Sequence, residues 1–309
     1  MLQKIILAAP RGPCAGVHRA LSVVEMALEK YGAPIFVNHE IVHNSHVVQS
    51  FEEKGVLFGT PLDEIPEGSV FIFSAHGVSP AFSKKVESKN FITIDATCPL
   101  VTKVHEEAKK YAIAGFQILF IGHRGHPEVE GTSGVTKMTI IETAEEAQAL
   151  EGENFGDAVA CLTQTTLSVD ETEKIMAVLK KKFPHLKTPK GSDICYATQN
   201  RQNAVKELAE KCDFIAVIGS AKSSNSNRLV DTAQKYCGGR DAINRVSTLI
   251  ESPATDISQI PKDVKILGVT SGASVPEYLV EEFLAHFPGI PTETIHFEEE
   301  NMRFALPKI

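Results

Sequence analysis

The feature that most constrains the fold is a repeat around three cysteines. In each copy an apolar, strand-like segment leads through a short turn to a cysteine, and a helical pattern follows directly. The copies read IILAAPRGPCAGVHRALSVVEMAL around Cys14, FITIDATCPLVTKVHEEAKKYAI around Cys98 and GSDICYATQNRQNAVKELAEKC around Cys195, where the strand signal is weakest. A repeated unit predicts a repeated structure, so the three cysteines are expected at equivalent positions.

A second pattern recurs at a fixed distance from each of the three cysteines. Twenty-five residues past each cysteine, an apolar strand ends in a polar residue, which is His39, His123 or Ser220. Another strand-end loop follows in each copy, in the segments VFIFSAHGVSP, AVACLTQTTLSVD and VKILGVTSGASVPE. Alternating strands and helices of this length predict parallel β-sheets covered by helices.

We therefore expect an α/β protein of three similar units with mainly parallel sheets, arranged around a pseudo-threefold axis with a central cluster. The expected units cover residues 1–95 with Cys14, 96–193 with Cys98 and 194–285 with Cys195, followed by a C-terminal tail, 286–309. Ligands of parallel sheets gather at the carboxyl ends of the strands, where the helices begin. The three cysteines can then converge on one point.

Composition and charge exclude several classes of function. The 309 residues are 43% hydrophobic, as in an ordinary globular protein, with a net charge of −8 and a pI near 5.8. That charge argues against a surface for nucleic acid or anionic membranes. No apolar run approaches membrane-spanning length, and the apolar stretch of MLQKIILAAP is too short for a signal peptide. A cytoplasmic protein is expected.

The cysteines lack a close C-x-x-C pair, and in a reducing compartment they are free thiols or ligands. Burial in a core is the commoner fate of a free cysteine. It does not explain equal placement at three helix starts, where the helix dipole favours thiolate. Cys161, Cys212 and Cys237 lie outside the repeat and are expected to be structural.

Three converging thiolates suit zinc or an iron–sulfur cluster. A 4Fe–4S cube held by three cysteines leaves one iron without a protein thiolate, and an open position is typical of a catalytic metal site. A zinc ion with three cysteine ligands and a water is the alternative from chemistry alone.

The segment HEIVH, residues 39–43, matches the H-E-x-x-H pattern of zinc metalloproteases. That pattern binds zinc only on a helix, where two histidines four apart share one face. Here an apolar strand over Ile35 to Asn38 precedes it, and Asn44 and Ser45 suggest the cap of a following helix. HEIVH is therefore expected on a loop, where it supplies phosphate ligands rather than zinc ligands.

The strand-end loops carry histidine, hydroxyl and amide side chains, together with one carboxylate. They are His39, His43, Asn44, Ser74, His76 and Ser79; His123, His126, Glu128, Thr163, Gln164, Thr165 and Ser168; Ser223, Ser224, Asn225, Thr270, Ser271 and Ser274. Taken singly, each is best explained as a buried hydrogen-bonded group or a helix cap. Grouped at helix N-termini beside three candidate thiolates, they favour a site for a small phosphorylated ligand.

These residues resemble those of the 4-hydroxy-3-methylbut-2-enyl diphosphate reductases, which catalyse the last step of the methylerythritol phosphate route to isoprenoids. The matching stretches are PRGPCAGVHRA, HEIVHN, FSAHGVS, DATCPLVTKVH, GHPEVEGT, TQTTLSVD, DICYATQNRQ, GSAKSSNSNRL and GASVPE. They span nearly the whole chain, including the tail around ENMRFALPK. Long strings in the right order make the resemblance specific.

The resemblance implies three lobes of α/β structure around one oxygen-sensitive 4Fe–4S cluster. The residues that match cluster ligands are Cys14, Cys98 and Cys195. Those that match diphosphate contacts are His43, His76, His126, Ser223, Ser224, Asn225 and Ser274, and Glu128 and Thr165 match residues near the substrate hydroxyl and the proton path. Glu128 is then the acid, relayed by Thr165 and His126, and Thr165 also lies against the substrate.

The implied reaction is a two-electron reductive dehydroxylation of an allylic alcohol diphosphate, giving isopentenyl and dimethylallyl diphosphates. No nicotinamide or flavin fingerprint occurs, so an external ferredoxin- or flavodoxin-like protein is the expected electron donor. Two alternatives remain open. One is a Cys₃-zinc hydrolase of a phosphorylated small molecule, and the other is a non-catalytic iron–sulfur sensor.

Overall fold

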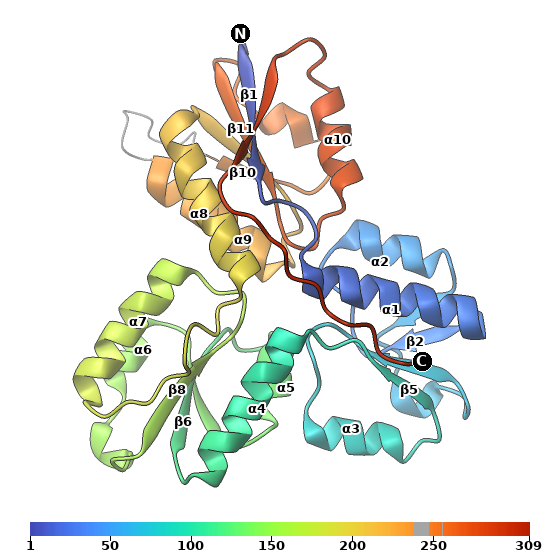
Figure 1. The fold of residues 1–309 in the computed structure, drawn as a ribbon, viewed down its shortest axis with the longest axis vertical. Helices are drawn as coiled ribbons and strands as arrows, with labels where there is room; N and C mark the ends of the chain where they lie inside the picture. The colour runs from blue at the N-terminus through green and yellow to red at the C-terminus, as the bar shows by residue number, and fades with distance from the viewer. Residues whose placement is uncertain (238–246, 255) are drawn as a thin grey trace. The chain divides into compact units, whose positions relative to one another are not determined.

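The computed structural model describes residues 1–237, 247–254 and 256–309, which form three parallel sheets with helices against them (Figure 1). The expectation of three similar α/β units with parallel strands is confirmed. By packing, the chain divides into two compact bodies. Body I holds residues 1–15, 43–47 and 196–303, and body II holds residues 16–42, 48–195 and 304–309.

The first sheet of body II is four-stranded, in the order β3-β2-β4-β5. Its strands are Val56–Phe58, Ile35–Val37, Val70–Phe73 and Ile92–Asp95 in that order. β2 and β4 are wholly apolar and wholly buried, as expected for parallel strands covered on both faces. The helices in this part of the chain are α1 (Ala15–Tyr31), α2 (Ser45–Glu52) and α3 (Pro80–Glu87), with a 3₁₀ turn at Leu62–Glu64.

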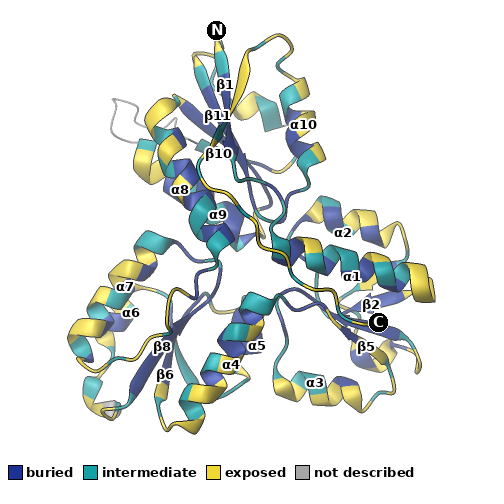
Figure 2. Cartoon of the chain, in the orientation of Figure 1, coloured by how far each residue is buried: buried dark blue, intermediate teal, exposed yellow. Residues whose placement is uncertain are grey.

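The second sheet of body II has the order β7-β6-β8. Its strands are Met138–Ile141, Gln117–Ile121 and Val159–Thr163 in that order. The accompanying helices are α4 (Pro99–Ile113), α5 (Pro127–Ser133), α6 (Ala144–Ala149) and α7 (Val169–Lys182), with a 3₁₀ turn at Gly152–Asn154. In Figure 2, β8 and most of β6 are buried, while the outer faces of α6 and α7 are exposed.

The sheet of body I has five strands in the order β10-β9-β11-β1-β12. They are Ser247–Ile250, Phe214–Ile218, Ile266–Ser271, Lys4–Ala9 and Thr292–His296 in that order. Its helices are α8 (Tyr196–Lys211), α9 (Ser224–Cys237) and α10 (Glu277–Ala285), with a 3₁₀ turn at Asp256–Gln259. Within the described part of the chain, no helix has the length and apolarity needed to cross a membrane.

The sheets differ at both ends of the chain from the expected division into 1–95, 96–193, 194–285 and a tail. β1 pairs with β11, with Ile5 opposite Leu267, and β12, from the expected tail, pairs with β1. The apolar β1 segment is therefore buried between strands that come from the other end of the chain. Sequence order does not reveal such a long-range pairing.

The strands that lead to two of the repeated cysteines occupy the same place in their sheets. β5, which leads to Cys98, pairs with β4, and β1, which leads to Cys14, pairs with β11. The weak strand expected before Cys195 is reduced to a single bridge between Lys187 and Ala160 of β8. The repeat is thus circularly permuted, because its third copy is completed by the N-terminal strand.

Candidate functional site

The three repeated cysteines have one backbone environment. Cys98 is the N-cap of α4, and Cys14 and Cys195 immediately precede α1 and α8. Each cysteine N–H donates to a carbonyl two residues past the end of a strand. The pairs are Cys98 with Ala75 (3.0 Å), Cys195 with Thr165 (3.0 Å) and Cys14 with Ala273 (3.2 Å). The equivalence of the three positions is confirmed, and each thiol stands at the positive end of a helix dipole.

Of the other three cysteines, Cys161 lies in a sheet core, and Cys212 and Cys237 are partly buried against the core of body I. Cys161 lies in β8 with 1% of its surface exposed, and burial raises the pKa of its thiol. Burial raises the pKa of Cys212 to about 12 and that of Cys237 to about 11. Thiols of this kind are neutral near pH 7 and poor ligands, which supports the structural role expected for them.

Three histidines from separate loops meet in body II. The ring of His76 lies edge-on to those of His39 and His126, with centroids 6.0 and 5.8 Å apart. Two glycines permit this approach. Gly77 has a φ of 76°, and a Cβ on Gly131 of α5 would lie 3.3 Å from the Gly77 carbonyl oxygen.

His126 caps the helix that carries Glu128. Its Nδ1 accepts the Glu128 N–H at 3.1 Å, and Pro127 occupies the first turn of α5. The proton of neutral His126 is therefore on Nε2. His76 Nδ1 lies 3.2 Å from the Ser74 hydroxyl, which fixes that ring as well.

Glu128 is paired with Thr165 in the interior. Oε1 accepts the Thr165 N–H at 2.7 Å, and Oε2 lies 2.9 Å from the Thr165 hydroxyl oxygen. Only 2% of Glu128 is exposed, so it is not a solvated first-turn glutamate. The same Thr165 accepts the Cys195 N–H through its carbonyl. The carboxyl is thus tied through one residue to a candidate ligand.

Burial raises the pKa of Glu128 to about 7, against the opposing effect of the two hydrogen bonds from Thr165, while the charge of Asp193 raises it further. Desolvation is the largest cause, and it is enough to raise the pKa of this carboxyl without any bound ligand.

Body I brings together His43, Asn225 and the loop after β11. The Ser274 hydroxyl donates to the His43 carbonyl at 3.1 Å, and Asn225 Oδ1 accepts the Ala273 N–H at 2.9 Å. The carbonyl of that same Ala273 accepts the Cys14 N–H. Asn225 and Ser274 are buried, with 4% and 7% of their surfaces exposed.

Several of the polar loop residues are helix caps. The side chains of Ser79 and Ser168 cap α3 and α7, and Asn44 Oδ1 accepts the Val47 N–H in the first turn of α2. Ser223 accepts the Ser226 N–H at the start of α9. For Ser79, Ser168 and Asn44 the cap is a sufficient explanation.

HEIVH lies on the loop between β2 and α2, as expected. Residues 39–43 form bends without helical structure, so the two histidines do not share a helical face. The helix required by the metalloprotease pattern is not present in this described segment.

The comparisons with known proteins decide the family. A family model described as LytB protein matches residues 5–287. The chain belongs to the LytB family. Curated relatives named 4-hydroxy-3-methylbut-2-enyl diphosphate reductase include one from Leifsonia xyli, 49% identical over 99% of this chain and 90% of that protein. Another, from Salmonella schwarzengrund, is 46% identical over 99% of this chain and 96% of that protein.

The fold matches solved structures as well. The E-1-hydroxy-2-methyl-but-2-enyl-4-diphosphate reductase from Plasmodium falciparum superposes with a TM-score of 0.93 at 36% identity, covering 99% of this chain and 96% of that chain. A second reductase structure, the terminal enzyme of the non-mevalonate pathway, gives 0.64 at 28% identity, covering 92% of this chain and 98% of that chain. This LytB-family chain is an oxidoreductase.

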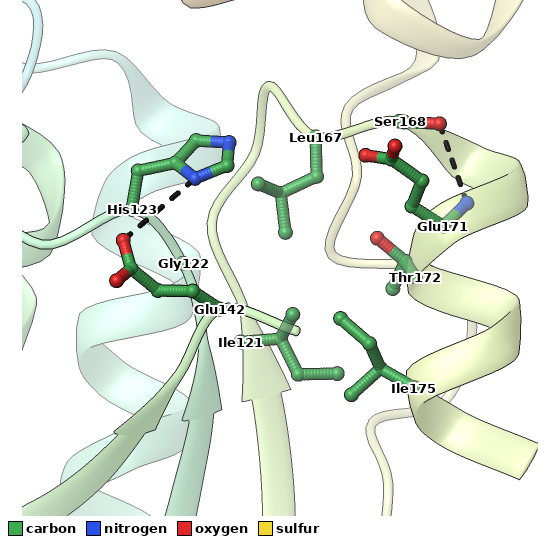
Figure 3. A pocket seen from close by; sticks show the side chains of 9 residues that line it. All are labelled: Ile121, Gly122, His123, Glu142, Leu167, Ser168, Glu171, Thr172 and Ile175. Atoms are coloured by element: carbon green, nitrogen blue, oxygen red, sulfur yellow. Dashed lines mark hydrogen bonds and ion pairs between the residues drawn. The ribbon is translucent and has the colours of Figure 1, made fainter. Parts of the chain in front are cut away.

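His123 and Ser168 of this LytB-family chain line a small cavity at the end of the second sheet (Figure 3). His123 Nδ1 faces Glu142 Oε1 at 3.9 Å, and the Ser168 hydroxyl accepts the Glu171 N–H. The floor is apolar, formed in part by Ile121, Leu167 and Ile175.

A buried carboxylate that sequence reasoning missed supports the Glu128 loop. The Asp193 side chain is 1% exposed, and its Oδ2 accepts the N–H of Thr163, two residues before Thr165. Burial raises the pKa of Asp193 to about 6, with the charge of Glu107 adding and that of Lys103 opposing. The sequence could have indicated Asp193 by its position, because it lies shortly before Cys195 as Asp95 lies shortly before Cys98.

Proposed function

We propose that this chain is a 4Fe–4S reductase that removes the hydroxyl group of 4-hydroxy-3-methylbut-2-enyl diphosphate. The products are isopentenyl and dimethylallyl diphosphates. The observation that carries the proposal is the buried Glu128–Thr165 pair, a proton donor joined through the Thr165 carbonyl to the cysteine at the start of α8. Membership of the LytB family and the names of its relatives supply the reaction class.

The donor set fits an iron–sulfur cluster. Cys14, Cys98 and Cys195 are partly exposed thiols that each stand at the start of a helix, whereas burial raises the pKa of Cys161, Cys212 and Cys237. We assign the first three as the cluster ligands. When bound, the cluster supplies electrons one at a time.

Glu128 and Thr165 can hold and move one proton. In the ionised form both carboxylate oxygens of Glu128 accept from Thr165, Oε1 from the N–H and Oε2 from the hydroxyl. When Glu128 is protonated, Oε1 still accepts the N–H, so the proton belongs on Oε2 and the bond to the Thr165 hydroxyl oxygen reverses. The Thr165 hydroxyl can then donate its own proton onward to the leaving oxygen. His126, fixed with its proton on Nε2, stands at the start of the same helix as a second relay.

The diphosphate is assigned to the histidine and hydroxyl loops. His76 and His126 are the binding residues of body II, and Thr165 lies against the substrate there. The assigned residues of body I are His43, Ser223, Ser224, Asn225 and Ser274. Imidazole, hydroxyl and amide donors near helix starts suit an anion that carries several acceptor oxygens.

The reaction consumes two electrons and two protons. The carbon–oxygen bond breaks, the oxygen leaves as water after accepting one proton, and the second proton adds to carbon. We assign the first proton to Glu128 and the electrons to a ferredoxin- or flavodoxin-like protein. A pKa near 7 suits a general acid that works at neutral pH.

Turnover of the authentic substrate is the test of this function. Anaerobically prepared protein, supplied with 4-hydroxy-3-methylbut-2-enyl diphosphate and dithionite, should yield both products by mass spectrometry. A protein with full iron and sulfide content but no product would instead be the iron–sulfur sensor. Zinc in colourless protein would point to the hydrolase.

A separate prediction concerns the histidines of the strand-end loops. His76→Ala and His43→Ala should each weaken pyrophosphate binding by about tenfold or more, the scale of a hydrogen bond to a charged group. The visible absorption of the cluster should not change. Calorimetry with pyrophosphate measures the affinity. His46→Ala is the matched control, because His46 bonds instead to the Glu251 carbonyl. If His43→Ala lost bound metal but kept its affinity for pyrophosphate, HEIVH would have a metal-binding role instead.

A further inference from the structure

Each helix that begins at a ligand cysteine carries a cation in its second turn. Arg19 and Lys103 stand five residues past Cys14 and Cys98, and Arg201 stands six residues past Cys195. On sequence alone each reads as an ordinary basic residue on a helix. In the structure each of the three contacts the segment just before a cysteine of a different copy of the repeat.

Arg19 holds the segment before Cys98. Its Nη1 donates to the Thr97 carbonyl at 3.0 Å and its Nη2 to the Asp95 carbonyl at 3.2 Å. The planar guanidinium thus spans the turn between β5 and α4. Its Nε donates to the Ala305 carbonyl, which fixes the side chain from the other edge.

Lys103 holds the segment before Cys195. Its Nζ lies 3.2 Å from Asp193 Oδ1, and Oδ2 of that carboxylate accepts the Thr163 N–H. Lys103 is 39% exposed, but its partner is almost completely buried. The contact therefore fixes an interior carboxylate two residues before the cysteine.

Arg201 holds the segment before Cys14. Its Nη2 donates to the Gly12 carbonyl at 2.8 Å, and its Nη1 is paired with Glu300 at 2.9 Å. The side chain is fully buried. The Gly12 N–H donates in turn to the Ser271 hydroxyl, so this turn is held on both sides.

We infer that Arg19, Lys103 and Arg201 are positioning residues for the cluster, each fixing the cysteine of the next copy in the order Cys14, Cys98, Cys195, Cys14. This inference rests on the proposed function for the identity of the bound group. Every ligand cysteine is then held twice. Its own N–H bonds to a strand-end loop, and a cation from the helix of the preceding copy of the repeat fixes the segment before it. A ligand held in this way loses less conformational freedom when it binds.

The inference predicts which thiol loosens when one cation is removed. In cluster-loaded Arg19→Met, Cys98 should react with an alkylating reagent about tenfold faster than in the parent protein, since hydrogen bonds to a charged group are lost. In Lys103→Met the faster thiol should be Cys195. Limited alkylation without oxygen, followed by peptide mass spectrometry, identifies the modified cysteine. Arg201 is left unchanged, because its removal would leave Glu300 without its buried partner.

Two controls separate positioning from general destabilisation. Lys109→Met removes a cation from the same helix as Lys103, with its Glu106 ion pair, and should keep the parent labelling pattern. Lys103→Arg retains a cation and should restore Cys195 toward its parent rate. Equal acceleration of all three thiols, or of the cysteine that starts the mutated helix, would overturn the inference.

The labelling also distinguishes failure of the inference from failure of the proposed function. A parent protein without iron and sulfide would overturn the cluster, whereas the same order of thiol reactivity in the metal-free variants would still support positioning. A loaded parent whose variants label in the parent order would overturn positioning alone.

Discussion

Glu128→Gln should bind substrate and keep its cluster, yet turn over at least about a hundredfold more slowly, the usual scale of general acid catalysis. Glutamine can accept the Thr165 N–H through Oε1 and donate to the Thr165 hydroxyl through Nε2. It therefore reproduces the hydrogen bonds of the protonated acid but cannot release a proton. Turnover with dithionite is the measurement, because it bypasses the donor protein.

Glu130→Gln is the matched control. It removes the same charge from the same helix, two residues on, at an exposed position. Its turnover should stay within about twofold of the parent, as for surface changes remote from the reaction. Parent-like turnover in Glu128→Gln would remove Glu128 from the mechanism.

The pKa of Glu128 predicts the pH dependence. With a pKa raised to about 7, the acid form is half populated near pH 7 and is lost as the pH rises further. Turnover of the parent should therefore fall with increasing pH across this range, although dithionite becomes a stronger reductant. Glu128→Gln should lack this fall. A parent profile that rises through pH 7 would contradict the assignment of an acid at this position.

The second large effect concerns the cysteines. Serine at position 14, 98 or 195 should abolish or greatly reduce the cluster, because a hydroxyl is a poor substitute for thiolate as an iron ligand. Iron and sulfide counts with visible absorption measure occupancy in protein prepared without oxygen.

The remaining cysteines are the internal controls. Cys212→Ser and Cys237→Ser should retain full occupancy, since these partly buried thiols pack against the core of body I, outside the repeat. Cys161→Ser should also retain occupancy per folded molecule, although it places a hydroxyl in a buried strand and should lower stability by about 1–3 kcal/mol. Full occupancy in a variant of Cys14, Cys98 or Cys195 would remove that residue from the ligand set.

Local pattern predicted much of this molecule. The strand–turn–helix repeat located the three equivalent cysteines, because strand and helix periodicities are set by nearby residues. The strand before HEIVH and the Asn44 cap after it placed those histidines on a loop. Grouping polar residues by strand ends identified Glu128, Thr165 and Asn225, which the structure joins to the cysteine loops.

The sequence pattern did not predict the long-range pairing of β1 with β11 and β12. Ile5 pairs opposite Leu267, which moves the first strand into the sheet of the last repeat. The burial that raises the pKa of Glu128 depends on packing that the local sequence pattern does not contain. Arg19, Lys103 and Arg201 look like ordinary basic helix residues until their distant partners are known.

Iron and acid-labile sulfide content of the purified protein, prepared without oxygen, decides whether this chain holds a 4Fe–4S cluster. A 4Fe–4S cluster predicts about four iron and four sulfide per chain with visible absorption, and no stoichiometric zinc. Colourless protein with stoichiometric zinc and no sulfide would contradict the assignment of a 4Fe–4S cluster to Cys14, Cys98 and Cys195.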